Sequence, residues 1–289
     1  MSVSPTSSHA RSAAWRREPL AAKVPEITVL FWVIKILTTG MGEATSDFLA
    51  KGNLVVAGVA GFAGFAVALW LQFRVRRYIA VVYWFAVAMV AVFGTMAADG
   101  LHVGLDIPYI VTTVFYAVVL AAVFFLWHRS EGTLSIHSIV TRRRETYYWL
   151  TVLATFALGT ALGDLTATTL RLGFLTSGLM FTGLILIPAL AWWRFRLNAV
   201  VAFWFAYVVT RPLGASFADY ISKPHAISGA NFGDGPTSAV LLIAIVILVA
   251  WVSIARKDIQ APQSAASAPA SGPIPADAAA AETAPSAGA

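Results

Sequence analysis

A tryptophan followed fifteen residues later by an aspartate occurs four times along this chain. The pairs are Trp32 with Asp47, Trp84 with Asp99, Trp149 with Asp164, and Trp204 with Asp219. In every copy a glycine stands five residues before the aspartate, at Gly42, Gly94, Gly159 and Gly214. A small residue directly precedes each aspartate. A pattern that returns in this way indicates internal repetition, so the fold must be built from four copies of one unit.

Each repeat lies in strongly apolar sequence. Hydrophobic residues make up 58% of the 289, charged residues only 12%, and the mean hydropathy is +0.75, whereas soluble domains carry about 25% charged residues. A helix that crosses a membrane needs about 20 mostly apolar residues. Eight stretches qualify, at about 26–48, 53–73, 78–99, 108–127, 146–168, 173–193, 198–219 and 237–255. The predicted fold class is therefore all-α, a polytopic membrane protein with eight transmembrane helices.

Two spans form each repeat, so all four repeats run in the same direction through the membrane. We expect the repeats at about 25–77, 78–144, 145–196 and 197–257, which together make one transmembrane domain. The flanking segments are a basic, polar stretch at 1–24 and an Ala/Pro-rich stretch at 258–289. Both are predicted to be disordered tails, because neither has enough apolar surface to bury.

The basic residues lie almost entirely on one side of this arrangement. Of the 20 lysines and arginines, 15 lie in the N-terminal tail or at the cytoplasmic ends of the repeats. The opposite loops contain only Lys51, Arg171 and Lys223, while Lys35 and Arg211 lie inside spans. Because positively charged loops stay in the cytoplasm, both termini are predicted to be cytoplasmic.

The four repeated aspartates are the leading candidates for a functional site, because an ionisable group in a membrane usually marks function. Arg77 and Asp99 are 22 residues apart, a helical length of about 33 Å. Straight helices would place the aspartates near the outer mouth, whereas tilting, or unwinding at the glycine, would place them deeper. In the alternative interpretation each aspartate faces water or headgroups separately, or caps a short following helix.

Repeat one adds a second carboxylate. Glu43 lies four residues before Asp47, so the two share one helix face. Two like charges at that distance favour the binding of a proton or a cation by the pair. Lys35 lies two turns before Glu43 and is predicted to neutralise it. In the alternative, Lys35 and Glu43 form an internal ion pair that serves structure only.

Repeat four places Arg211 directly before Pro212 inside a span. The proline removes a backbone hydrogen bond and is expected to kink the helix. A buried arginine needs a partner, and the natural one is Asp219 or a carboxylate of another repeat. The pair would serve either structure or function.

Threonine hydroxyls accompany these charges. Thr95 and Thr160 occupy the position of Glu43 in repeats two and three, and Thr39 lies one turn before Glu43. All three are predicted to help bind the ion. For the hydroxyls of repeat three, Thr160 among them, the alternative is that they bond back to their own helix instead of lining a polar path.

The chain has no cysteine, and its five histidines lie in loops or tails, so a buried haem pair is not expected. A metal site would use carboxylate and hydroxyl oxygens, which favours hard cations such as Mg²⁺, Mn²⁺ or Ca²⁺. The predicted ligands are Glu43, Asp47, Asp99, Asp164 and Asp219. No cofactor and no nucleic-acid partner is expected; the partners are the lipid bilayer and a small cation or proton.

The four repeats and their tryptophans resemble a bacterial family of uncharacterised membrane-anchored proteins with four tandem two-helix repeats of unknown function. The resemblance extends over about residues 25–257 and includes the runs 38–43 and 211–219. It implies the same eight-helix architecture in a bacterial inner membrane, and it implies no activity.

The leading hypothesis is a transporter or exporter of a small cation, either a hard divalent metal such as manganese or a proton-coupled ion. Its site would form where the first helices of the repeats meet. The alternatives are an ion channel with a carboxylate ring at its mouth and a non-transporting scaffold or sensor. An intramembrane protease has less support, since Ala161 replaces the first glycine of the motif that precedes Asp164. The chain is therefore not expected to be an enzyme.

Overall fold

The computed structural model describes residues 22–256 and 258–260, and within these residues it is helical and contains no strand. The described chain forms eight α-helices: α1 (Val29–Ala50), α2 (Leu54–Arg74), α3 (Ala80–Leu105), α4 (Tyr109–Glu131), α5 (Arg142–Asp164), α6 (Phe174–Phe195), α7 (Ala199–Ser222) and α8 (Asp234–Ala255). A π-helical segment, Leu165–Thr169, extends α5. Each helix matches one predicted span closely, except that α3 continues to Leu105.

Seven of the eight described helices are long and apolar enough to cross a membrane. The exception is α1, which contains Lys35, Glu43 and Asp47. Lys35 and Glu43 are buried and Asp47 is half-buried, so these charges face protein instead of lipid. Exposed Val, Leu, Ile and Phe side chains cover the outside of the bundle, as a lipid-facing surface requires. The chain is therefore an all-α polytopic membrane protein.

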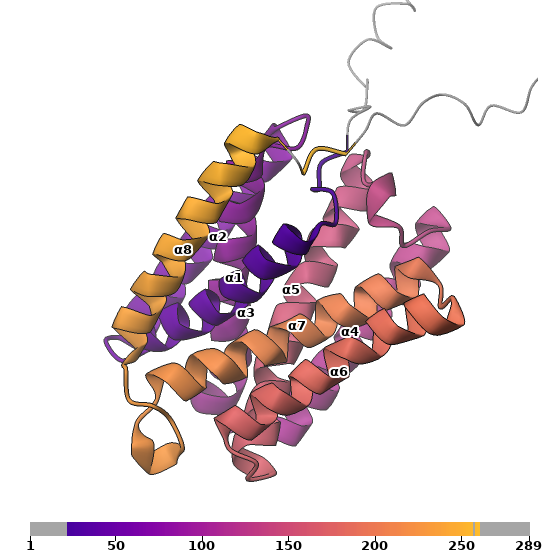
Figure 1. Cartoon of the computed structure of the whole chain (residues 1–289). Coiled ribbons are helices and arrows are strands. Elements are labelled where there is room, and N and C mark those ends of the chain that lie inside the picture. Colours follow the sequence, from indigo (N-terminus) through magenta and orange to yellow (C-terminus); the bar gives the residue numbers. More distant parts are fainter. Residues whose placement is uncertain (1–21, 257, 261–289) are drawn as a thin grey trace, which may run out of the picture.

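The first helices of the four repeats, α1, α3, α5 and α7, form a closed inner ring in which each packs against two others (Figure 1). The second helix of each repeat lies outside this ring and packs mainly on the first helix of the next repeat. These outer contacts are α2 on α3, α4 on α5, α6 on α7, and α8 on α1. The repeats are therefore interlocked, and the last repeat closes the ring onto the first.

The shared glycine of each repeat allows two inner helices to approach closely. A Cβ atom built at any of these glycines would lie closer than 3.0 Å to a side-chain atom of the next inner helix. The contacts are Gly42 with Ala91, Gly94 with Phe156, Gly159 with Arg211, and Gly214 with Thr39. All four inner helices run unbroken through the glycine, and α7 also continues through Pro212. The glycines thus serve close packing, and the aspartates lie toward the C-terminal ends of the four inner helices.

Eight aromatic side chains, here called the aromatic layer, pack inside the inner ring near the end that carries both termini. The residue before each repeat tryptophan contacts the tryptophan of the next repeat, with ring centroids 5.7–6.3 Å apart. The pairs are Phe31 with Trp84, Tyr83 with Trp149, Tyr148 with Trp204, and Phe203 with Trp32. All of these side chains except Trp32 are buried. The layer therefore fills the middle of the ring at this end.

Ordered structure extends past the predicted inner edges of both tails. Lys23 is buried and pairs with Glu145, which also accepts a hydrogen bond from Gln72 at 3.1 Å. Asp258 is buried and accepts a hydrogen bond from the Tyr78 hydroxyl. The prediction of disorder is therefore wrong at these two edges, where Lys23 and Asp258 pack against the bundle. The rest of the predicted tails, 1–21 and 261–289, lies outside the described residues, as does residue 257.

Candidate functional site

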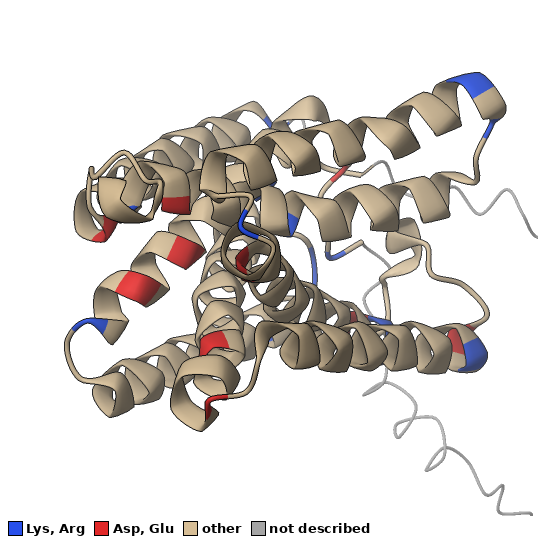
Figure 2. Cartoon of the chain, turned by 90° about the horizontal axis from the view of Figure 1, so that it is seen from below, with Lys and Arg blue, Asp and Glu red and all other residues tan. Residues whose placement is uncertain are grey.

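Charged side chains gather inside the inner ring beyond the aromatic layer, toward the opposite end of the bundle. Figure 2 views the molecule from below and shows acidic segments on several different helices. The innermost pair joins Glu43 on α1 to Arg211 on α7, with Oε2 and Nη2 3.0 Å apart. Arg211 is 0% exposed and Glu43 is also buried. The prediction that Arg211 pairs with a carboxylate of another repeat is confirmed, and the alternative partner, Asp219, is not the one that it contacts.

Two threonines in the next repeats surround Glu43. The hydroxyls of Thr95 and Thr160 donate to Glu43 Oε2 at 3.3 and 3.1 Å, and both accept from Arg211. Thr39 behaves differently. Its hydroxyl bonds back to its own helix, and its backbone carbonyl accepts from Arg211 Nη1 at 2.8 Å. The structure thus places the hydroxyls of Thr95 and Thr160 at the site, whereas the prediction of a site hydroxyl at Thr39 is wrong, because that hydroxyl bonds to its own helix.

Lys35 does not pair with Glu43, so that prediction is wrong. Its side chain is 0% exposed, and its Nζ has no hydrogen-bond partner among the described residues. The Nζ atom lies 4.5 Å from the ring centroid of Phe156 and 4.1 Å from that of Tyr207. The reason is the register: two turns of helix separate Lys35 from Glu43, and Arg211 reaches Glu43 across the ring from α7.

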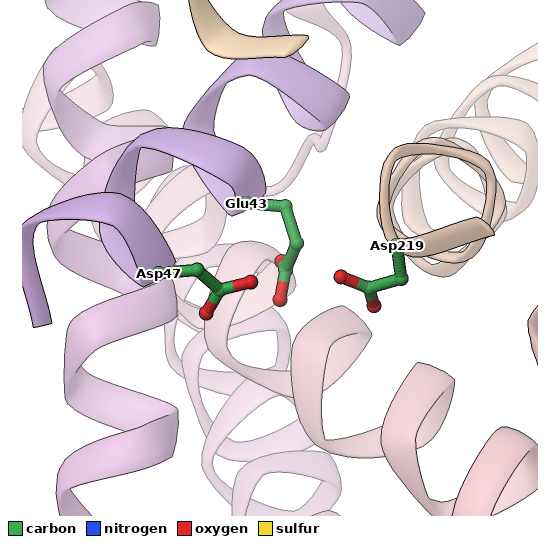
Figure 3. Close-up of side chains that lie close together, drawn as sticks. All are labelled: Glu43, Asp47 and Asp219. Atoms are coloured by element: carbon green, nitrogen blue, oxygen red, sulfur yellow. The ribbon is translucent and has the colours of Figure 1, made fainter. Parts of the chain in front are cut away.

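Three carboxylates form a compact group that we call the carboxylate cluster: Glu43 and Asp47 on α1 and Asp219 on α7 (Figure 3). One oxygen atom of each lies within 4.8 Å of the other two. Glu43 and Asp47 share a helix face, as the sequence predicts. Asp219 Oδ1 is fully buried and accepts no hydrogen bond from any described group. A buried carboxylate oxygen without a donor is costly, so this atom is a natural ligand for a proton or a metal ion.

Asp99 on α3 and Asp164 on α5 are half-buried at the same level of the ring. Their charges interact with that of Glu43 and with each other. They do not belong to the group whose oxygens lie within 4.8 Å of one another. The five predicted ligands are therefore brought to one region, but only three of them are close enough to share a metal ion in this structure.

Lys223, which ends α7, lies above the carboxylate cluster and was not among the predicted site residues. Its Nζ donates to Asp47 and lies 3.8 Å from Asp219 and 3.6 Å from Asp234. Burial alone would lower the pKa of Lys223, but the charges of Asp219 and Asp47 outweigh it and raise that pKa above its ordinary value. Lys223 therefore remains an ammonium ion. The four-residue spacing from Asp219 was the available sequence signal.

The site contains more acidic than basic groups. Five carboxylates, Glu43 and the four repeat aspartates, stand against two basic groups that pair with them, Arg211 and Lys223, because Lys35 contacts only aromatic rings. Adding Asp234 with its partner Lys51, 2.6 Å away, leaves the balance unchanged. Full ionisation of these groups would leave three uncompensated negative charges in a low-dielectric region, which is unfavourable. Protons, a divalent cation or both would offset this excess.

Comparison with known proteins places the chain in a family. Its sequence matches the model described as Repeat of Unknown Function (DUF347) four times in tandem, at residues 30–78, 82–133, 147–198 and 202–258. The chain belongs to this family, and the four matches correspond to the four predicted repeats. No curated protein and no solved structure matches the chain.

Proposed function

Because its family has no assigned activity, we propose a function from the site itself: the protein is a multi-pass transporter or exporter of a small hard cation. The cation is a divalent metal such as Mn²⁺, or an ion exchanged for protons, and it binds at the carboxylate cluster. The distribution of basic residues supports an orientation with both termini in the cytoplasm, and the resemblance to a bacterial family favours a bacterial inner membrane.

The observation that carries this proposal is the buried Asp219 oxygen within a group of three carboxylates from two different repeats. The three carboxylates are satisfied unequally. Arg211 and the two threonines bind Glu43, and Lys223 bonds to Asp47. Asp219 Oδ1 accepts no hydrogen bond from the described groups and lies 3.8 Å from the Lys223 ammonium. Such an arrangement inside a membrane favours an added positive charge.

The two ends of the ring favour a carrier over a channel. At the outer end Asp99, Asp164 and Asp47 are half-buried, so solvent reaches this level in part. At the other end, the space between the four inner helices is filled by the aromatic layer, whose side chains contact one another. A channel requires one continuous polar path, whereas a carrier requires a site that opens to one side at a time.

The test is cation flux into proteoliposomes that contain the purified full chain and a Mn²⁺-sensitive dye, repeated with a pH-sensitive dye. The variants Asp47→Asn and Asp219→Asn keep the side-chain shape and remove the charge. Each is expected to lower the rate of Mn²⁺ flux about tenfold or more, because each removes a direct ligand.

Asp106→Asn is the matched control. Asp106 lies in the loop after α3, is exposed and has φ 55, a conformation that asparagine also adopts. This variant should transport at the wild-type rate. Wild-type flux in both Asp47→Asn and Asp219→Asn would contradict the proposal, as would the absence of any cation-dependent signal from the wild-type protein.

A further inference from the structure

Lys223 has an unusual position for a loop lysine. Its side chain is only 20% exposed, and its Nζ lies among three carboxylates that come from α1, α7 and α8. Lys51, the other lysine near these groups, is 66% exposed and contacts Asp234 alone. An ammonium group in such surroundings occupies the volume that a bound metal ion would need, because a metal ion also requires oxygens from several elements at short distance.

We propose that the Lys223 ammonium is a tethered occupant of the carboxylate cluster, and that a transported cation and Lys223 bind there in mutual exclusion. The inference rests on the proposed function and adds a residue and a mode of competition to it. In the absence of a cation, Lys223 neutralises Asp47. When a cation arrives, it takes the oxygens of Asp47 and Asp219, and the lysine side chain swings out.

The charge balance favours this exchange for a divalent cation. Lys223 supplies one positive charge to a site in which the carboxylates still outnumber the basic groups that pair with them. A divalent ion in its place supplies two, so the exchange brings the site closer to neutrality while the released ammonium moves into water. A monovalent ion carries the same charge as the lysine that it displaces, so the exchange leaves the net charge of the site unchanged. The tethered lysine therefore favours divalent over monovalent cations.

The backbone around Lys223 allows the side chain to move while α7 stays in place. The Lys223 N–H donates to the Asp219 carbonyl at 2.8 Å, and the Lys223 carbonyl accepts from the Asn231 N–H at 2.7 Å. Both backbone groups of Lys223 are therefore anchored by hydrogen bonds. Its φ of −76° and ψ of 156° are ordinary extended values. The long, flexible lysine side chain is then the only part that has to rearrange.

The first experiment needs no variant. The purified full chain is treated with an amine-acylating reagent, with and without saturating Mn²⁺, and the modification of Lys223 and Lys51 is followed by peptide mass spectrometry. Lys223 is only 20% exposed and its amine is enclosed by carboxylates, so the reagent reaches it slowly. Release of the side chain by Mn²⁺ should therefore raise the labelling rate of Lys223, while the rate of Lys51, which is already 66% exposed, stays the same. An unchanged Lys223 rate under Mn²⁺ concentrations that saturate transport would overturn the inference.

The second experiment measures Mn²⁺ affinity by calorimetry and by flux. Lys223→Gln removes the competing charge and should lower the apparent dissociation constant about tenfold, whereas Lys223→Arg, which keeps the charge, should stay near wild type. Lys51→Gln is the matched control and should leave the affinity unchanged.

If Lys223 is instead only a structural ion-pair partner, Lys223→Gln will weaken Mn²⁺ binding or leave it unchanged, and labelling will not respond to Mn²⁺. Either result overturns the inference while wild-type transport and its loss in Asp47→Asn still support the proposed function. A wild-type protein that neither binds nor moves Mn²⁺ overturns both for this ion.

Discussion

The two ends of the inner ring come from the same four repeats, which are alike at one end and, apart from the shared glycine and aspartate, differ at the other. In the aromatic layer every repeat contributes a tryptophan preceded by Phe or Tyr, and the same ring contact recurs four times. At the level of Glu43 the equivalent residues are Thr95, Thr160 and Ala215. One turn nearer the aromatic layer they are Thr39, Ala91, Phe156 and Arg211. Repetition thus builds the scaffold and supplies one aspartate per repeat, whereas Glu43 and Arg211, which form the innermost ion pair, each occur in a single repeat.

This comparison separates two kinds of substitution. A change that preserves the repeated packing should leave stability nearly intact, whereas a change in a residue found in one repeat should affect the buried charges. Arg211 belongs to both groups, because its stem packs against Gly159 and its guanidinium holds Glu43.

The largest effect is therefore expected for Arg211→Met. This variant keeps a long apolar stem but leaves the Glu43 carboxylate with only two threonine donors. Breaking one partner of a buried ion pair costs about 3–5 kcal/mol. Unfolding in detergent, followed by tryptophan fluorescence, should show this loss as a lower midpoint.

The same substitution at Arg194, which is exposed at the end of α6, should change stability by less than about 0.5 kcal/mol. The double variant Glu43→Gln with Arg211→Met removes both charges and should recover much of the loss. A single variant as stable as wild type would show that the pair does not hold the two helices together.

The sequence was sufficient for features that lie within one helix or recur in every repeat. The four copies of the Trp…Gly…Asp pattern predicted the parallel two-helix units, and the four-residue spacing of Glu43 and Asp47 predicted their shared face. The repeated glycines left two roles open, close packing or a bend in the helix, and the contacts between the inner helices support packing.

Features that depend on the register between helices could not be predicted. Lys35 and Arg211 were both candidates to neutralise Glu43, and only the packing of α1 against α7 decides between them. The same holds for the hydroxyls of Thr39 and Thr95, of which one turns to its own helix and the other to the site. Lys223 reaches Asp47 across 176 residues of sequence.

An intermediate effect is expected where the glycine contact is broken. Gly159→Ala would place a Cβ atom closer than 3.0 Å to the Cβ and Cγ atoms of Arg211. Because Arg211 is fixed at the centre of the ring, α5 has to move away from α7, at a cost of about 1–3 kcal/mol. The unfolding midpoint should fall, and Mn²⁺ flux should fall with it.

Gly183→Ala in the outer helix α6 is the matched control, because no atom lies within 4 Å of the added methyl group. There the higher helix propensity of alanine should raise stability, by up to about 1 kcal/mol. If both variants shift the midpoint in the same direction, the distinction between closely packed inner helices and open outer helices is wrong.

The smallest effect is expected for Tyr83→Phe, which makes repeat two more like repeats one and four, where Phe31 and Phe203 occupy this position. The variant removes the buried hydrogen bond between the hydroxyls of Tyr83 and Tyr148 and leaves the ring packing in place. It should cost about 0.5–1.5 kcal/mol and leave Mn²⁺ flux unchanged. Adding Tyr148→Phe removes the second hydroxyl of this hydrogen bond. The double variant should be no less stable than Tyr83→Phe alone, because it does not leave the Tyr148 hydroxyl without its Tyr83 partner. A strong loss of flux in Tyr83→Phe, with the unfolding midpoint preserved, would instead make the aromatic layer part of the transport path, and the functional contrast between the two ends of the ring would no longer hold.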